Sequence, residues 1–139
     1  MSVRFDILTL FPEMIEGMLN QSILKRAIEK KIIEVNIINF RDFSTNKHST
    51  VDDYAYGGGA GMLISVEPIH LAMKTIPNID KAYKILTSPS GNVYNQNKAE
   101  KLSKLDHIVI VCGHYEGIDN RILDYIDEEI SIGDYVLTG

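Results

Sequence analysis

The sequence has a single cysteine, no long apolar run and no excess of positive charge. Because Cys112 is alone among 139 residues, an internal disulfide and a metal site built from several cysteines are both excluded. No apolar run approaches the roughly 20 residues that a membrane-spanning helix requires. The first residues, Met1–Arg4, lack the basic stretch and long apolar run of a signal peptide. We therefore expect a cytoplasmic protein that has no membrane partner.

The formal net charge of −5 argues against a protein that holds nucleic acid by itself. Such proteins usually display a basic surface, because contacts with phosphates supply most of the affinity. The segment Asp119–Asp134 is strongly acidic, and Arg121 is its only cation. If RNA is the substrate, a second subunit or a further domain must supply most of the electrostatic attraction.

Composition and periodicity predict one α/β domain. With 45% hydrophobic and 24% charged residues, a chain of this length can bury a core. Short apolar strands alternate with helical patterns, which is typical of a mostly parallel sheet flanked by helices. The expected strands are Arg4–Leu10, Ile32–Asn39, Ala82–Thr87, His107–Cys112 and Glu129–Ile132. The expected helices are Pro12 to about Lys31, Val66–Ile76, Gln96–Leu105 and Asn120–Tyr125.

The segment Phe40–Gly61 has no periodicity, and long loops of this kind are usually functional or disordered. We favour a functional loop, because tyrosines and aspartates accompany the glycine cluster Gly57–Gly61. The cluster does not follow the first strand and no lysine follows it, so it is neither a dinucleotide fingerprint nor a phosphate loop. His48 with the neighbouring aspartates could be imagined as a metal site, but no cysteine or second histidine lies nearby. We predict no metal.

Three glycine-containing loops are expected at the carboxyl ends of strands: Ser88–Gly91, Gly113–Asp119 and Gly133–Gly139. Ligands of open α/β sheets bind outside these ends, and glycine lets the backbone approach a ligand closely. Each loop by itself could simply turn the chain. Glu116 is equally compatible with a helix-start acid and with a carboxylate that faces a cationic ligand. Cys112 is expected to be a buried, inert core residue.

The loops, taken in order, resemble one family along the whole chain. The matching segments are "LFPEM" at Leu10–Met14, "NFRDF" at Asn39–Phe43, "KHSTVDDYAYGGGAGM" at Lys47–Met62, "CGHYEGIDNR" at Cys112–Arg121 and "DEEISIGDYVLTG" at Asp127–Gly139. Together they resemble the bacterial tRNA (guanine-N1)-methyltransferases, which modify the guanosine at position 37 beside the anticodon. The resemblance implies a SPOUT-class α/β fold with a trefoil knot, a homodimer, and S-adenosylmethionine as methyl donor. A Rossmann-type oxidoreductase is the disfavoured alternative, because Phe11–Glu13 stands where its fingerprint would be.

The resemblance also implies two groups of site residues. The donor pocket would comprise Leu86, Ser88, Pro89, Gly113, Tyr115, Glu116, Gly117, Ser131, Ile132, Gly133, Asp134, Tyr135, Val136, Leu137 and Gly139. The segment that covers the target guanine would contribute His48, Asp52, Tyr56, Gly57, Gly58 and Gly59.

Two departures from the family pattern affect these expectations. Ala55 stands where the family has proline, which loosens the start of the glycine segment without removing a polar contact. The family also continues beyond the residue equivalent to Gly139, with the rest of the knot, the catalytic aspartate, its partner arginine and an RNA-binding domain. We therefore expect residues 1–139 to be an incomplete S-adenosylmethionine-binding domain, inactive by itself. A non-catalytic module that binds the donor or only dimerises is the alternative.

Overall fold

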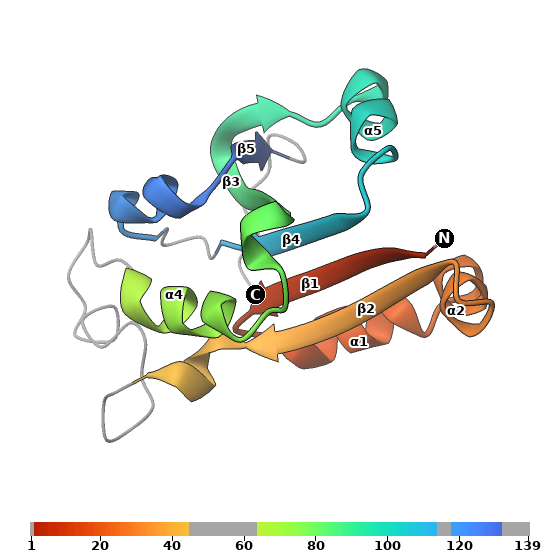
Figure 1. Ribbon diagram of the computed structural model, residues 1–139, viewed down its shortest axis with the longest axis horizontal. Helices are drawn as coiled ribbons and strands as arrows, with labels where there is room; N and C mark the ends of the chain where they lie inside the picture. The colour runs from red at the N-terminus through yellow and green to blue at the C-terminus, as the bar shows by residue number, and fades with distance from the viewer. Residues whose placement is uncertain (1, 45–63, 114–117, 132–139) are drawn as a thin grey trace.

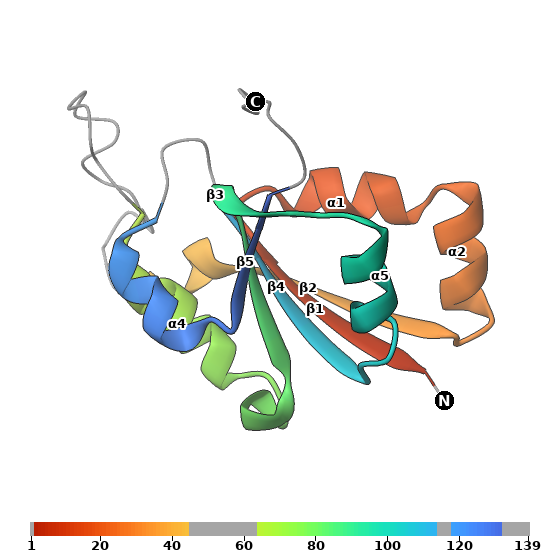
Figure 2. The same ribbon diagram turned by 90° about the horizontal axis from the view of Figure 1, so that it is seen from above.

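The computed structural model describes residues 2–44, 64–113 and 118–131, which form a five-stranded sheet with helices on both faces (Figures 1 and 2). In chain order the described elements are β1 Val3–Thr9, α1 Pro12–Leu19, α2 Ser22–Glu29, β2 Ile33–Asn39, η1 Phe40–Phe43, α4 Val66–Lys74, η2 Ile79–Lys81, β3 Tyr83–Val93, α5 Gln96–Leu102, β4 His107–Cys112, η3 Asn120–Tyr125 and β5 Glu128–Ser131. The three elements labelled η are short 3₁₀ helices.

The strand order is β2-β1-β4-β3-β5, and each neighbouring pair is parallel. The run of β-branched residues in β4 therefore lies at the centre of the sheet, as the sequence predicts. Val109 and Val111 of this strand have no exposed surface. Because all five strands point the same way, their carboxyl ends meet at one edge. The predicted α/β architecture is confirmed.

The two faces of the sheet are covered to different degrees. Figure 2 shows α4 and η3 on one face, and α1, α2 and α5 on the other. The α4 face holds the larger core, in which Ile69, Ala72, Met73 and Ile76 are buried as their helical spacing predicts. The opposite face has a smaller core around Ile108. Burying one such aliphatic side chain contributes about 1.5–3 kcal/mol, so the α4 face contributes most of the hydrophobic stabilisation.

The single helix predicted from Pro12 to about Lys31 is wrong, because the chain forms two helices there. The break lies at Asn20 and Gln21, where Gln21 adopts an extended backbone with φ −84° and ψ 157°. Asparagine and serine side chains compete for backbone hydrogen bonds, so Asn20 and Ser22 favour helix ends over helix interiors. The apolar periodicity continues across the break and conceals it.

The predicted strand Ala82–Thr87 extends further, to Val93 as β3. Thr87 and Asn92 both pair with Ile130 of β5, so the register shifts between them. Ser88–Gly91, predicted to be a loop, is therefore a bulge within β3. The prediction missed the second half of the strand because proline, glycine and asparagine are all depleted in strands.

The remaining boundaries lie close to those expected. The helix expected to reach Leu105 ends at Leu102 as α5, η3 spans the expected residues, and β5 ends at Ser131 rather than Ile132. Within the described ranges, no helix combines the length and apolar character needed to cross a membrane.

Candidate functional site

The carboxyl ends of β3, β4 and β5 form one site at the edge of the sheet. Thr87 of β3 pairs with Cys112 of β4 on one side and with Ile130 of β5 on the other. The bulge after Thr87, the residue after Cys112 and the end of β5 therefore lie next to one another (Figure 2). The described starting points of the three predicted loops are therefore neighbours, whereas residues 114–117 and 132–139 lie outside the described ranges.

Thr87 connects two of these strand ends, and sequence analysis missed it. Its Oγ1 accepts a hydrogen bond of 3.0 Å from the backbone N–H of Gly113. The backbone N–H of Gly113, a residue of the predicted donor pocket, is thus bound by Thr87. Thr87 pairs with Cys112, the residue before Gly113. Because this pairing joins two strands distant in sequence, the sequence gives only a weak signal for the contact.

Gly113 and Gly91 are required at this edge because a side chain has no room. A Cβ on Gly113 would lie 2.6 Å from the backbone oxygen of Thr87. A Cβ on Gly91 would lie 2.6 Å from the carbonyl carbon of Glu129 and 2.7 Å from the nitrogen of Ile130. Glycine here serves close approach of two backbones. Gly91 and Gly113 therefore have a structural role in addition to the predicted role in ligand binding.

Ser88 and Glu129 make a side-chain contact across the site. The Ser88 Oγ donates a hydrogen bond of 2.8 Å to Oε2 of Glu129. Ser88 belongs to the predicted donor pocket, whereas Glu129 was not singled out as a site residue. Leu86, also predicted for the pocket, is only 5% exposed and packs in the α4-side core.

Cys112 is half-buried and ends β4 beside Gly113. Cys112 is thus less buried than expected: it shares its sheet face with Ile110, which is also only half-buried. Burial nevertheless raises the pKa of the Cys112 thiol to about 11. The thiol is therefore protonated and inert at neutral pH, as predicted.

We expect iodoacetamide to alkylate Cys112 slowly in the folded chain at neutral pH, because the thiolate is the reactive form. The rate should rise with pH toward the pKa of about 11. An unfolded cysteine has a pKa near 8.5, so denaturant should accelerate the reaction roughly 100-fold or more. Equal rates for the folded and the urea-unfolded chain at neutral pH would contradict this assignment.

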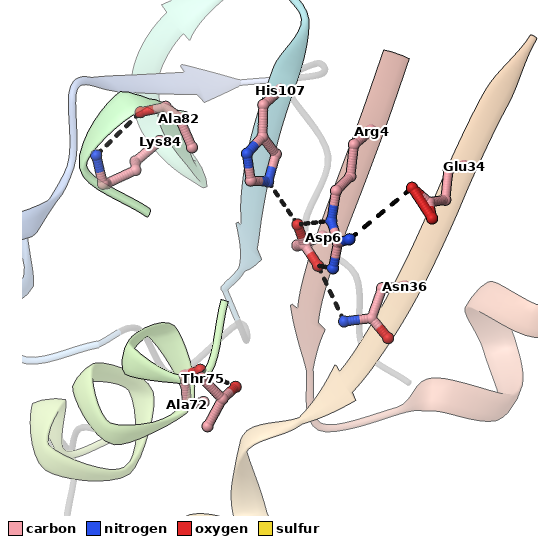
Figure 3. A network of polar contacts seen from close by, with 9 residues as sticks. All are labelled: Arg4, Asp6, Glu34, Asn36, Ala72, Thr75, Ala82, Lys84 and His107. Carbon is pink, nitrogen blue, oxygen red and sulfur yellow. Dashed lines mark hydrogen bonds and ion pairs between the residues drawn. The ribbon is translucent and has the colours of Figure 1, made fainter. Parts of the chain in front are cut away.

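A buried polar network lies across the first halves of β1, β2 and β4, away from their carboxyl ends (Figure 3). Asp6 of β1 has no exposed surface and accepts hydrogen bonds from Arg4, from Asn36 of β2 and from His107 of β4. The His107 Nε2 lies 2.6 Å from Oδ2 of Asp6. Burial raises the pKa of Asp6, but the three donors outweigh it and lower the pKa overall. Glu34 lies 3.8 Å from Arg4 at the exposed rim.

A second network joins β3, β5 and α5. Glu128 accepts a hydrogen bond from Tyr83 and forms an ion pair with Lys98. The bond to Glu128 raises the pKa of the Tyr83 hydroxyl to about 12. Neither network reaches the bulge of β3. Both therefore tie strands together, and neither is a catalytic arrangement.

Two surface hollows are lined by described residues. A hollow of about 390 Å³ between α4 and η3 is lined by residues such as His70, Lys84 and Asp127. Another of about 430 Å³ lies beside α5 and includes Lys101 and Leu102. Among the described histidines, cysteines and acids, no group of three or more is arranged to hold a metal ion.

Many predicted site residues lie outside the described ranges. These are His48, Asp52, Tyr56, Gly57, Gly58, Gly59, Tyr115, Glu116, Gly117, Ile132, Gly133, Asp134, Tyr135, Val136, Leu137 and Gly139. Two described neighbours of these segments are nevertheless paired. Ile64, which follows residues 45–63, forms a parallel bridge with Ile118, which follows residues 114–117. Asp119 N–H also donates to the Ile64 carbonyl at 3.0 Å.

The parallel sheet, with helices on both faces and the carboxyl ends of its strands at one edge, defines an α/β domain. Within that class, a profile of the family described as tRNA (Guanine-1)-methyltransferase TrmD matches residues 3–139. The chain therefore belongs to the tRNA (guanine-1)-methyltransferase TrmD family. The resemblance seen in the sequence motifs is confirmed.

Relatives and a solved structure agree with this membership. The chain is 53% identical over 137 residues to the tRNA (guanine-N(1)-)-methyltransferase of Metamycoplasma arthritidis, covering 99% of this chain and 59% of that protein. It is 56% identical over 138 residues to the one of Carboxydothermus hydrogenoformans, covering 99% and 54%. The crystal structure of tRNA (m1G37) methyltransferase from Aquifex aeolicus matches with a TM-score of 0.85 at 40% identity, over 99% of this chain and 63% of that chain. The chain thus spans little more than half the length of these curated relatives.

Proposed function

We propose that this chain carries the S-adenosylmethionine site of a tRNA (guanine-N1)-methyltransferase that acts on guanosine 37. The supporting observation is the junction of three strand ends at Thr87, Gly113 and Ser131, in a chain whose relatives are named for this reaction. On this proposal residues 1–139 are the donor-binding domain. A trefoil knot at this edge and a cytoplasmic location belong to the same proposal.

The described residues suit a ligand with a purine, a sugar and a charged amino-acid tail. Such a ligand needs close backbone approach and several precisely placed polar groups. Ser88 contributes a hydroxyl at this edge, and Gly91 and Gly113 let the neighbouring strands approach closely enough to form it. The predicted pocket residues outside the described ranges follow directly in sequence from Gly113 and Ser131. S-adenosylmethionine, when bound, would supply an activated methyl group.

The proposed reaction is a methyl transfer to the N1 nitrogen of guanine. A carbon–nitrogen bond forms as the carbon–sulfur bond breaks, and the N1 proton passes to a general base. The part of this chain is to hold both reactants in line, because correct positioning removes much of the entropic barrier. We assign no residue of this chain as the base.

We propose that the segment with His48, Asp52, Tyr56 and Gly57–Gly59 contributes to the guanine site. The pairing of Ile64 with Ile118 supports this, because it joins the ends of the long segment and of the Gly113 segment. Two stretches distant in sequence are thereby joined at one place.

We also propose that the chain assembles as a homodimer through α1 and α2. Phe11, Met14, Met18 and Ile23 are 39%, 57%, 57% and 80% exposed. Large apolar side chains gathered on one side of a molecule usually mark an interaction surface. Within the described residues no side chain of α1 is buried, which supports an interface role for its exposed apolar side chains.

Methyl transfer from radiolabelled S-adenosylmethionine tests the proposed activity. The substrates are two transcripts of one tRNA, with guanosine or adenosine at position 37. The complete gene product is expected to label the guanosine transcript and to leave the adenosine transcript unlabelled, because only guanine presents this protonated N1. Equal labelling of both transcripts, or of neither, would contradict the proposed function.

A further inference from the structure

We propose that Glu129 is a positioning residue for the methyl-donor site, holding Ser88 and the β3 bulge against β5. The inference rests on the proposed function, since it assigns a role within that site. The hydrogen bond from Ser88 Oγ to Glu129 Oε2, 2.8 Å long, is the contact that carries it. We call this pair the Ser88–Glu129 clamp.

Glu129 contacts both ends of the bulge. Its carboxylate binds the side chain of Ser88, the first bulge residue, while its backbone lies against Gly91, the last. A Cβ on Gly91 would be 2.6 Å from the Glu129 carbonyl carbon and 2.8 Å from its oxygen. The pairing of β3 with β5 resumes at Asn92. One residue of β5 therefore determines where the bulge begins and where it closes.

The bulge needs such a restraint because its residues do not pair with β5. Thr87 and Asn92 share Ile130 as partner, so the four residues between them lie outside that ladder. Ordering each free residue costs about 1–2 kcal/mol of backbone entropy. A hydrogen bond to a carboxylate is roughly twice as strong as one between neutral groups, so the clamp offsets part of that cost.

The Ser88–Glu129 clamp also uses the hydrogen-bond donor of the Ser88 hydroxyl. Serine has a single hydroxyl hydrogen, and here it is directed at Glu129. Any contact between this oxygen and the donor molecule is therefore made with Ser88 as acceptor. Its partner on the ligand must be an N–H or O–H group, such as an amino group or a ribose hydroxyl.

Glu128 is a natural control for Glu129. Neighbouring residues of a strand point to opposite faces, and Glu128 accordingly faces Tyr83 and Lys98 instead of the bulge. Loss of Glu128 should lower stability by breaking that network. It should not change the affinity for a ligand at the carboxyl edge.

The test is calorimetric titration of the 139-residue chain with S-adenosylhomocysteine, with NADH as negative control. The variants are Glu129→Ala, Glu129→Gln, Ser88→Ala, Glu128→Ala and the Ser88→Ala/Glu129→Ala double variant. Glu129→Ala is expected to weaken S-adenosylhomocysteine binding about 10-fold, since hydrogen bonds to charged groups are worth about one power of ten or more. Glu129→Gln keeps an acceptor for Ser88 and should recover most of the affinity. Glu128→Ala should bind like the wild type.

The double variant separates positioning from independent contacts. If Glu129 acts through Ser88, the double variant should bind no more weakly than the weaker single variant. Losses that multiply in the double variant, or a Glu129→Ala chain that binds like the wild type, would overturn the proposal. A wild-type chain that binds NADH instead would refute the proposed function itself. Hydrogen exchange then still shows whether Glu129 restrains the bulge, because Glu129→Ala should raise exchange of the amides between Thr87 and Asn92 and Glu128→Ala should not.

Discussion

Replacing Gly113 by alanine is expected to abolish tight donor binding and to destabilise the chain. The new Cβ would lie 2.6 Å from the backbone oxygen of Thr87, and a strand backbone in the middle of the sheet cannot move away cheaply. Overpacking of this kind costs about 1–3 kcal/mol. The 3.0 Å hydrogen bond from Gly113 N–H to Thr87 Oγ1 should be lost with it, which adds about 1 kcal/mol. Urea unfolding measures the loss of stability, and calorimetry with S-adenosylhomocysteine the loss of affinity, which we expect to exceed roughly 10-fold.

Gly17 provides the matched control for this substitution. No atom lies within 4 Å of a Cβ built on Gly17, which is in the middle of α1. Alanine is favoured over glycine in a helix interior by about 0.5–1 kcal/mol, so Gly17→Ala should stabilise the chain and leave ligand affinity unchanged. If Gly113→Ala behaved like Gly17→Ala in both measurements, the close approach of β3 and β4 at this edge would be refuted.

The second large effect is expected from Asp6→Ala, which removes the acceptor at the centre of the buried polar network. The substitution leaves Arg4 and His107, with side chains 31% and 15% exposed, without their shared partner. Breaking a buried charged pair by removing one member costs about 3–5 kcal/mol, and we expect roughly 3 because Arg4 is partly solvated. This is a large fraction of the roughly 5–15 kcal/mol that stabilises a domain. Urea unfolding at neutral pH is the measurement.

Glu34→Ala is the control for the buried polar network. Glu34 is 61% exposed on its side chain and lies 3.8 Å from Arg4, so its loss should cost less than about 1 kcal/mol. A loss of stability in Asp6→Ala as small as in Glu34→Ala would show that the network does not hold the strands together.

The Asp6 contribution should also depend on pH in a defined direction. The folded-state pKa of Asp6 is lowered, so the folded chain binds this proton less readily than the unfolded chain. The stabilisation is therefore fully present above the unfolded pKa of about 3.9 and is lost as the pH falls through the lower folded value. The difference in stability between the wild type and Asp6→Asn should shrink below about pH 4. A constant difference across that range would contradict the assignment.

The sequence predicted the elements whose periodicity is strong. The β-branched run of β4 and the buried side of α4 follow from side-chain spacing alone, because burial on a sheet or helix face is local in sequence. The break at Asn20–Gln21 was not predicted, since the apolar spacing is the same on both sides of it. The second half of β3 was missed because its pairing with β5 depends on contacts roughly 40 residues away, as in the Ser88–Glu129 bond.

The convergence of the strand ends was predicted, but the residues that organise them were not. The rule that parallel strands end at one edge needs only their order and direction. The bonds from Gly113 to Thr87 and from Ser88 to Glu129 depend on strand register, which sequence spacing does not determine. Asp6 was missed for the same reason, because its partners Asn36 and His107 come from two other strands.

The central claim is that the methyl donor binds at the edge of the sheet formed by the β3 bulge and the ends of β4 and β5. The most direct test is to titrate the ¹⁵N-labelled chain with S-adenosylhomocysteine and to follow the chemical shifts of its backbone amides. The largest saturable shifts are expected at Thr87, Gly113 and Ser131. The amides of Asp6, in the middle of β1, and of His107, at the start of β4, should be unaffected. Saturable shifts concentrated around Asp6 and His107, with none at the other three residues, would contradict the account.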